Sequence, residues 1–142
     1  MTTMPYAEAT ATDAKTSGLV WTGRVLSAVV ALFLLFDGAI KLIPLQVVID
    51  TVIPLGWPTD PMTWRALGVV LIASALLYAY PRTSVLGAIL ITAYLGGAVA
   101  TQVRVGSPLF SHMLFGVYLA LFAWGGLWLR EPRLREIFPL RG

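Results

Sequence analysis

The chain has 142 residues, of which 58% are apolar and only 12% are charged, and its formal net charge is +3. Soluble domains contain about 45–50% apolar and about 25% charged residues, so this composition excludes an ordinary water-soluble domain and predicts an integral membrane protein. The absence of cysteine excludes disulfides, thiol nucleophiles and thiolate metal ligands, and a single histidine excludes a multi-histidine metal site within one chain. The basic residues stand singly at the ends of apolar runs, so no nucleic-acid partner is expected.

The chain begins with a polar segment, residues 1–18, which is rich in Thr and Ala and has no apolar periodicity. We expect this segment to be a flexible tail. A cleaved signal peptide is the alternative, because Arg24 precedes an apolar stretch. The long polar leader, and the charged residues Asp37 and Lys41 that follow the stretch, argue against cleavage.

Four long apolar segments follow the polar tail. Each has a length that suits a hydrocarbon layer of about 30 Å, which a helix of about 20 residues crosses. The segments lack the period-two alternation of a membrane β-barrel. We therefore predict an all-α integral membrane protein, an antiparallel four-helix bundle over residues 19–130, with spans at about 19–43, 62–80, 84–103 and 109–129.

Two segments outside the spans are expected to lie at the membrane surface. Residues 45–53, between the first two spans, are predicted to form a short interfacial helix. Residues 131–142 form a basic amphipathic tail, which is expected to rest on lipid headgroups.

The cations predict the orientation of the bundle. Four spans place both termini and the turn after the second span on one side of the membrane. That side holds Lys15, Arg24, Arg82, Arg130, Arg133, Arg135 and Arg141, whereas the other side holds Lys41, Arg65 and Arg104. By the positive-inside rule, both termini are expected in the cytoplasm, and the opposite end of the bundle is the outer end.

Small residues in the third and fourth spans predict close helix packing, because small side chains let helix backbones approach closely in lipid. In the third span they form the rows Ala88, Thr92, Gly96, Ala100 and Ala93, Gly97, Thr101, and in the fourth span they are Gly116, Ala120, Gly125 and Gly126.

Polar side chains from all four spans fall at the level of the outer end. They are Asp37, Lys41, Arg65, Gln102, Arg104 and His112. Isolated charges are disfavoured at such a depth, so we predict that these six side chains line one ligand-binding pocket. Three cations and one acid favour an anionic or carbonyl-bearing headgroup. The alternative is that they are helix-end residues at the interface, with an Asp37–Lys41 ion pair that joins the first span to its neighbours.

His112 has several interpretations when it is considered alone. It could be a capping or hydrogen-bonding residue, a proton carrier or an axial haem ligand. A structural or interface role is favoured among these. No metal site is predicted. The sequence has no phosphate-binding glycine loop, paired acidic motif or nucleophile constellation. No catalytic residue is therefore nominated, and whether the protein is an enzyme stays open.

Several runs of the sequence have a familiar order. They are Trp21–Arg24, Phe36–Leu42, Tyr80–Thr83, Leu86–Leu90, Tyr94–Thr101, Val103–Gly106, Pro108–Phe110 and Trp124–Arg130. Together they resemble the DoxX-like family of small four-helix membrane proteins, and the resemblance covers nearly all of residues 21–140. It implies a bacterial inner (cytoplasmic) membrane protein. It also implies a link to redox chemistry, because the family's namesakes are associated with a thiosulfate:quinone oxidoreductase and other relatives with membrane redox assemblies.

Two positions depart from the family pattern. The family often carries a glutamate near Gly68 and a histidine where Gln102 stands, and this chain has neither. These departures argue against carrying over proton or redox chemistry. We therefore expect a non-catalytic or accessory subunit that binds a quinone-like or lipid-like molecule in the outer pocket, with quinone as the candidate cofactor.

Two alternatives stay open at this stage. One is a component of a thiosulfate:quinone-type membrane oxidoreductase, and the other is a membrane scaffold or assembly factor without a ligand. The expected surroundings are the lipid bilayer, and the candidate partners are a membrane redox protein and a second copy of the chain.

Overall fold

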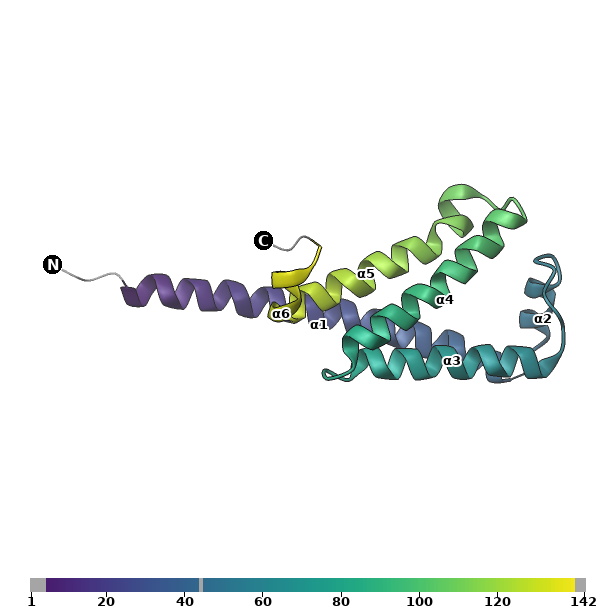
Figure 1. Ribbon diagram of the computed structural model, residues 1–142, viewed down its shortest axis with the longest axis horizontal. Helices are drawn as coiled ribbons and strands as arrows, with labels where there is room; N and C mark the ends of the chain where they lie inside the picture. The colour runs from purple at the N-terminus through teal and green to yellow at the C-terminus, as the bar shows by residue number, and fades with distance from the viewer. Residues whose placement is uncertain (1–4, 44, 140–142) are drawn as a thin grey trace.

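The computed structural model describes residues 5–43 and 45–139, and these residues form helices and connecting turns without a β-strand. The elements in chain order are α1 (Pro5–Leu42), α2 (Gln46–Val52), α3 (Pro61–Ala79), α4 (Ser84–Arg104), the π-helix η1 (Leu109–Met113), α5 (Phe115–Arg130) and α6 (Pro132–Ile137) (Figure 1).

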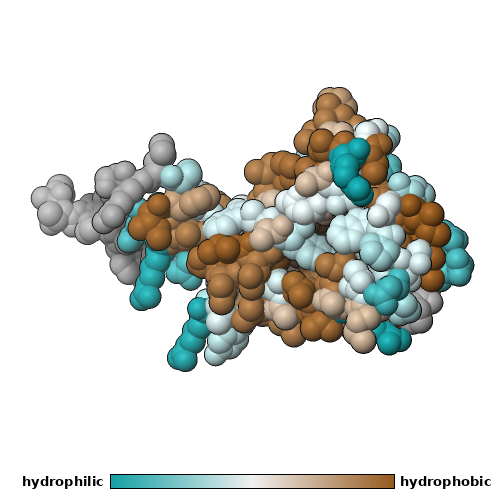
Figure 2. All heavy atoms as spheres, turned by 45° about the vertical axis from the view of Figure 1, so that its right-hand side comes forward, coloured by the Kyte–Doolittle hydropathy of each residue, from teal (hydrophilic) through white to brown (hydrophobic). Residues whose placement is uncertain are grey.

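Four stretches are long and apolar enough to cross a membrane: Ser17–Leu42, Pro61–Ala79, Ser84–Arg104 and Leu109–Arg130. They form a bundle in which α1 and α4 each pack against both α3 and α5. Only 22% to 33% of each span is buried inside the bundle, so most of the apolar surface needs lipid as its solvent. Figure 2 shows brown hydrophobic side chains over much of the surface, interspersed with white and pale residues, and deep-teal hydrophilic ones mainly toward its left and right sides. The predicted fold class, an all-α membrane bundle, is confirmed.

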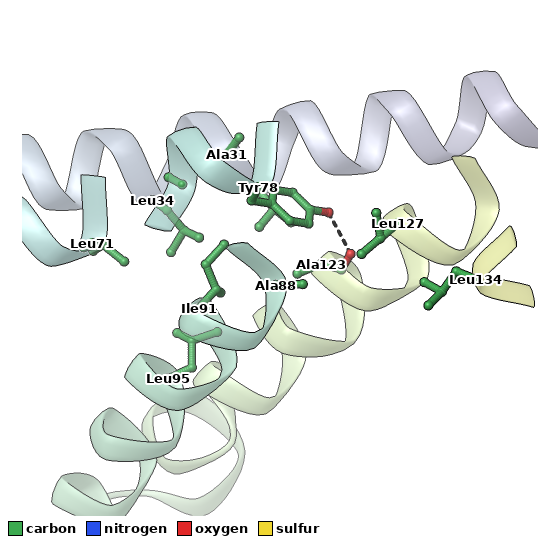
Figure 3. Close-up of a cluster of buried hydrophobic side chains, with 12 residues drawn as sticks. Ala31, Leu34, Leu71, Tyr78, Ala88, Ile91, Leu95, Ala123, Leu127 and Leu134 are labelled. Carbon is green, nitrogen blue, oxygen red and sulfur yellow. Dashed lines mark hydrogen bonds between the residues drawn. The ribbon is translucent and has the colours of Figure 1, made fainter. Parts of the chain in front are cut away.

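The packed core lies where all four spanning helices meet, and Figure 3 shows its side chains converging from α1, α3, α4 and α5. Tyr78 of α3 is fully buried at its centre. Its hydroxyl donates a hydrogen bond to the carbonyl oxygen of Ala123 at 2.7 Å and lies 3.0 Å from the hydroxyl of Ser27. The one phenol in this core therefore joins α3 to both α1 and α5.

Glycines mark the closest helix crossings. A Cβ added to Gly126 of α5 would lie 2.8 Å from Ser27 Oγ, and one added to Gly68 of α3 would lie 2.7 Å from the carbonyl oxygen of Gly38. In contrast, Gly96, Gly97 and Gly125 have nothing within 4 Å of an added Cβ. The close packing expected for these last three glycines is wrong, because Gly96 and Gly125 face a groove between α4 and α5, and Gly97 faces a cavity at the outer end.

The outer end, which we define as the end of the bundle away from the chain termini, carries α2 and the turn that leads into α3. Residues 46–52 form the short helix that the sequence predicts between the first two spans. Asp60 caps α3 by accepting hydrogen bonds from the backbone N–H of Met62 and Thr63, and from the Thr63 hydroxyl. These bonds hold the pKa of the Asp60 carboxyl below its ordinary value.

The N-terminal end of the chain differs from the expectation. Residues 5–18 continue α1 as a helix where a flexible tail is expected, because a helix that already exists can extend without a new nucleus. Residues 1–4 lie outside the described residues. At the other end, α6 folds back onto α5, with Leu134 buried. Contact of this segment with lipid headgroups stays a prediction, and residues 140–142 lie outside the described range.

Candidate functional site

A cavity of about 470 Å³ lies at the outer end between α1, α4 and α5. It occupies the region where α4 and α5 diverge from α1 and α3 in Figure 1. Its roof comes from Val52, Leu55, Trp57 and Trp64. The two indole rings pack edge to face with centroids 5.8 Å apart, and the Trp64 N–H donates to the carbonyl of Pro58 at 2.7 Å. These contacts hold the roof against the start of α3. We call this space the outer cavity.

An ion pair lies on the α1 wall of the outer cavity. Lys41 Nζ is 2.5 Å from Asp37 Oδ2, one helical turn away, and both side chains line the cavity. The Lys41 side chain is 14% exposed and that of Asp37 is 31% exposed. The pair neutralises two charges that would be costly to hold singly in an apolar span.

The opposite wall carries Gln102 from α4 and His112 from η1. Gln102 Oε1 accepts a hydrogen bond from the Ser107 hydroxyl at 2.5 Å, which leaves its amide NH₂ group as a donor for a ligand. His112 Nδ1 lies 2.8 Å from the Ser111 hydroxyl, which leaves Nε2 as the ring nitrogen for a ligand. The two walls therefore present polar groups across a mostly apolar space.

A π-helical turn brings His112 to this wall. In η1, the N–H of Met113 bonds the carbonyl of Pro108 at 3.1 Å, and the N–H of Leu114 bonds that of Leu109 at 3.0 Å. Such turns are rare and often mark functional sites. The apolar pattern of residues 109–129 predicts one regular helix and gives no sign of this irregularity.

Arg65 and Arg104 do not line the outer cavity. Arg104 is exposed and donates a hydrogen bond to the carbonyl of Leu55, so it ties the roof to α4. Arg65 is also exposed and borders a separate small pocket of about 20 Å³. Of the six predicted site residues, the structure thus brings four together: Asp37, Lys41, Gln102 and His112. The cavity wall carries one acid and one cation, where three cations were expected.

Three aromatic residues of the cavity wall that carry polar atoms were not predicted as site residues. They are Tyr94, Trp57 and Trp64. Tyr94 lies two helical turns before Thr101, which also lines the cavity, so helical periodicity offers a signal for it. Nothing local to the two tryptophans predicts that they cover a cavity.

The comparison with known families agrees with this architecture. A family model described as the DoxX-like family matches residues 25–126. The chain belongs to the DoxX-like family. The matched range includes every residue that lines the outer cavity and ends before α6. Searches of the curated proteins and of the solved structures found no match.

The structure shows the surroundings of Gly68 and Gln102, the two positions at which a departure from the family was expected. Gly68 lies at the crossing of α1 and α3, where a side chain would meet the Gly38 carbonyl, so this position has no room for a glutamate in the present packing. Gln102 does line the outer cavity, and the imidazole there comes from His112, the one histidine of the chain. Among the described residues, no group of three His, Cys, Asp or Glu side chains is placed to hold a metal ion.

Proposed function

We propose that this DoxX-like membrane protein is a non-catalytic or accessory subunit that binds a neutral, carbonyl-bearing molecule of the quinone type in the outer cavity. The observation that carries the proposal is the cavity itself. Its volume of about 470 Å³ falls within the range of about 300–1,000 Å³ that is typical of small-molecule sites. Its walls are mostly apolar, with a few polar groups on opposite sides, as such sites require.

The charge of the cavity favours a neutral head over an anionic one. Lys41 is already paired with Asp37, and the guanidinium groups of Arg65 and Arg104 lie elsewhere. An anionic headgroup would therefore find no unpaired cation among the described residues that line the cavity. A quinone ring needs only hydrogen-bond donors at its two carbonyl oxygens, and Lys41 and Gln102 offer donors from opposite walls.

A role in a membrane redox assembly would use the same site. The chain has no cysteine, so electrons would have to reach a bound quinone from a partner protein or from a further bound cofactor. This alternative adds an electron donor to the proposal and leaves the chemistry of quinone binding unchanged.

The binding experiment combines extraction with titration. We expect mass spectrometry of the detergent-purified protein to recover a quinone at near-stoichiometric amounts, and an added quinone to quench tryptophan fluorescence saturably. Gln102→Leu should weaken binding about 2- to 13-fold, the value of one hydrogen bond of about 0.5–1.5 kcal/mol. Gln46→Leu is the matched control, because Gln46 is exposed on α2 and does not line the outer cavity. Absence of both a recovered quinone and saturable quenching would refute the proposal, and a stable co-purifying protein would then favour a scaffold.

The proposed orientation places both termini in the cytoplasm of a bacterial cell, with the outer cavity near the opposite membrane surface. It rests on the excess of cations at the terminal end of the bundle. The chain has no cysteine of its own, so single cysteines can be introduced as labels. A cysteine at position 60 should react with an impermeant reagent added outside the cell. A cysteine at position 135 should react only after the membrane is permeabilised. The reverse labelling pattern would invert the topology.

A further inference from the structure

A second hollow lies on the lipid-facing side of the bundle. It is a groove of about 570 Å³ between α4 and α5 with an almost entirely apolar lining. We call it the lateral groove. Its lining includes Thr92, Gly96, Ala120, Leu121, Gly125 and Phe138. The small residues create the space, since an added Cβ on Gly96 or Gly125 would meet nothing within 4 Å.

The lateral groove and the outer cavity share part of their walls. Leu95, Val99 and Gly116 line both spaces. Gly116 contributes no side chain, and a Cβ added there would lie 2.8 Å from Val99 Cγ2 and 3.7 Å from Leu95 Cβ. The partition between the two spaces at the α4–α5 seam is therefore about one side chain thick.

Two contacts join the walls of the lateral groove toward the end that lies near the chain termini. The Trp124 N–H donates to the Thr92 hydroxyl at 2.7 Å, and the Trp124 ring stacks on Phe138 with centroids 5.2 Å apart. The groove extends along α5 from Gly116 to Trp128, which at 1.5 Å per residue corresponds to about 18 Å.

The dimensions of the groove suit a hydrocarbon chain. The groove has a volume of about 570 Å³ over a length of about 18 Å, so it is long and narrow. A helix from a second copy is the alternative occupant of this face, and quinone binding that does not depend on the groove would favour it. An extended acyl or isoprenoid chain is thin enough, and the apolar walls match its chemistry.

We propose that the α4–α5 seam at Val99 and Gly116 is a lateral portal, and that the lateral groove holds the hydrocarbon tail of a molecule whose carbonyl head occupies the outer cavity. This inference rests on the proposed function. The two spaces adjoin at Leu95, Val99 and Gly116, where α4 and α5 are in contact, so passage of the tail requires that this contact open. The head then lies among polar groups, and the tail extends along an apolar track that is open to lipid. A membrane-dissolved molecule thereby reaches the cavity without crossing water.

A reversible crosslink tests the portal. In the double variant Val99→Cys/Gly116→Cys, oxidation joins α4 to α5 at the partition, and reduction releases them within the same sample. The chain has no other cysteine. The single variants Val99→Cys and Gly116→Cys are the matched controls, because each carries one of the two substitutions and cannot form the crosslink. The probes are a quinone with two isoprenoid units and the same ring without a tail.

We expect oxidation of the portal pair to slow binding and release of the tailed quinone at least about tenfold, with recovery on reduction and no effect of oxidation in the single-cysteine controls. Gly125→Leu, which fills the groove, should weaken the tailed quinone about tenfold and leave the tailless ring unchanged, since it displaces buried tail surface. If a crosslinking pair does not fold, Val99→Ala should speed binding of the tailed quinone, whereas Val103→Ala, which lines neither space, should not.

The outcomes separate the two proposals. Saturable binding of the tailed quinone that is insensitive to both the portal crosslink and Gly125→Leu would overturn the portal and leave the proposed function standing. Absence of saturable binding of either probe by the native chain would overturn both.

Discussion

Gly126→Ala should lower the free energy of unfolding by about 1–3 kcal/mol, whereas Gly125→Ala should leave it unchanged or raise it by up to about 1 kcal/mol. The two glycines are neighbours on α5, but they face different surroundings. A Cβ on Gly126 would lie 2.8 Å from Ser27 Oγ and 3.1 Å from the Gly23 carbonyl oxygen, so α1 and α5 would have to separate. A Cβ on Gly125 meets nothing within 4 Å and only adds helix propensity.

Both variants replace one glycine of α5 by alanine, but only Gly126 lies at the crossing with α1. A difference in stability between them therefore reports the closeness of that crossing and not the general effect of replacing a glycine. Denaturant or thermal unfolding in one detergent, followed by helical circular dichroism, supplies the measurement. Equal effects of the two substitutions would mean that the α1–α5 crossing is looser than the structure shows.

Asp37→Asn should cost about 0.6–2 kcal/mol of stability, the range of intramembrane polar contacts, and should weaken quinone binding as well. The substitution leaves Lys41 without its charged partner, which lies 2.5 Å away in the native chain. Asp50→Asn is the control, because Asp50 is exposed on α2 and bonds only Gln46, at 2.8 Å, among the described residues.

A double variant separates the stability of the pair from its role in binding. Asp37→Asn/Lys41→Met removes the unpaired charge, so stability should return toward the native value, as replacement of buried ion pairs by apolar residues often allows. Quinone affinity should stay low, because the Lys41 donor is gone. Full recovery of binding in the double variant would show that the ion pair has only a structural role.

Local sequence patterns were sufficient to predict some of the residues of the candidate site. Asp37 and Lys41 are four residues apart, and an i,i+4 pair of opposite charges in an apolar helix has few alternatives to mutual contact. Gln102 and His112 were placed at the correct depth by the lengths of their spans. The contacts of the Arg65 and Arg104 side chains could not be predicted from the sequence. A long, flexible side chain at a helix end can extend to lipid, to the cavity roof or into the cavity. The neighbouring elements decide which of these contacts forms.

The sequence by itself determined that the chain is a four-span helical membrane protein, for a physical reason that acts locally. Lipid offers no hydrogen bonds to the backbone, so each apolar segment of about 20 residues must satisfy its own peptide groups as a helix. The relative tilt of these helices depends on side-chain packing between segments far apart in the chain. Only the tertiary structure therefore showed that Gly126 contacts α1 while Gly125 faces an open groove, and that the divergence of α4 and α5 opens the outer cavity.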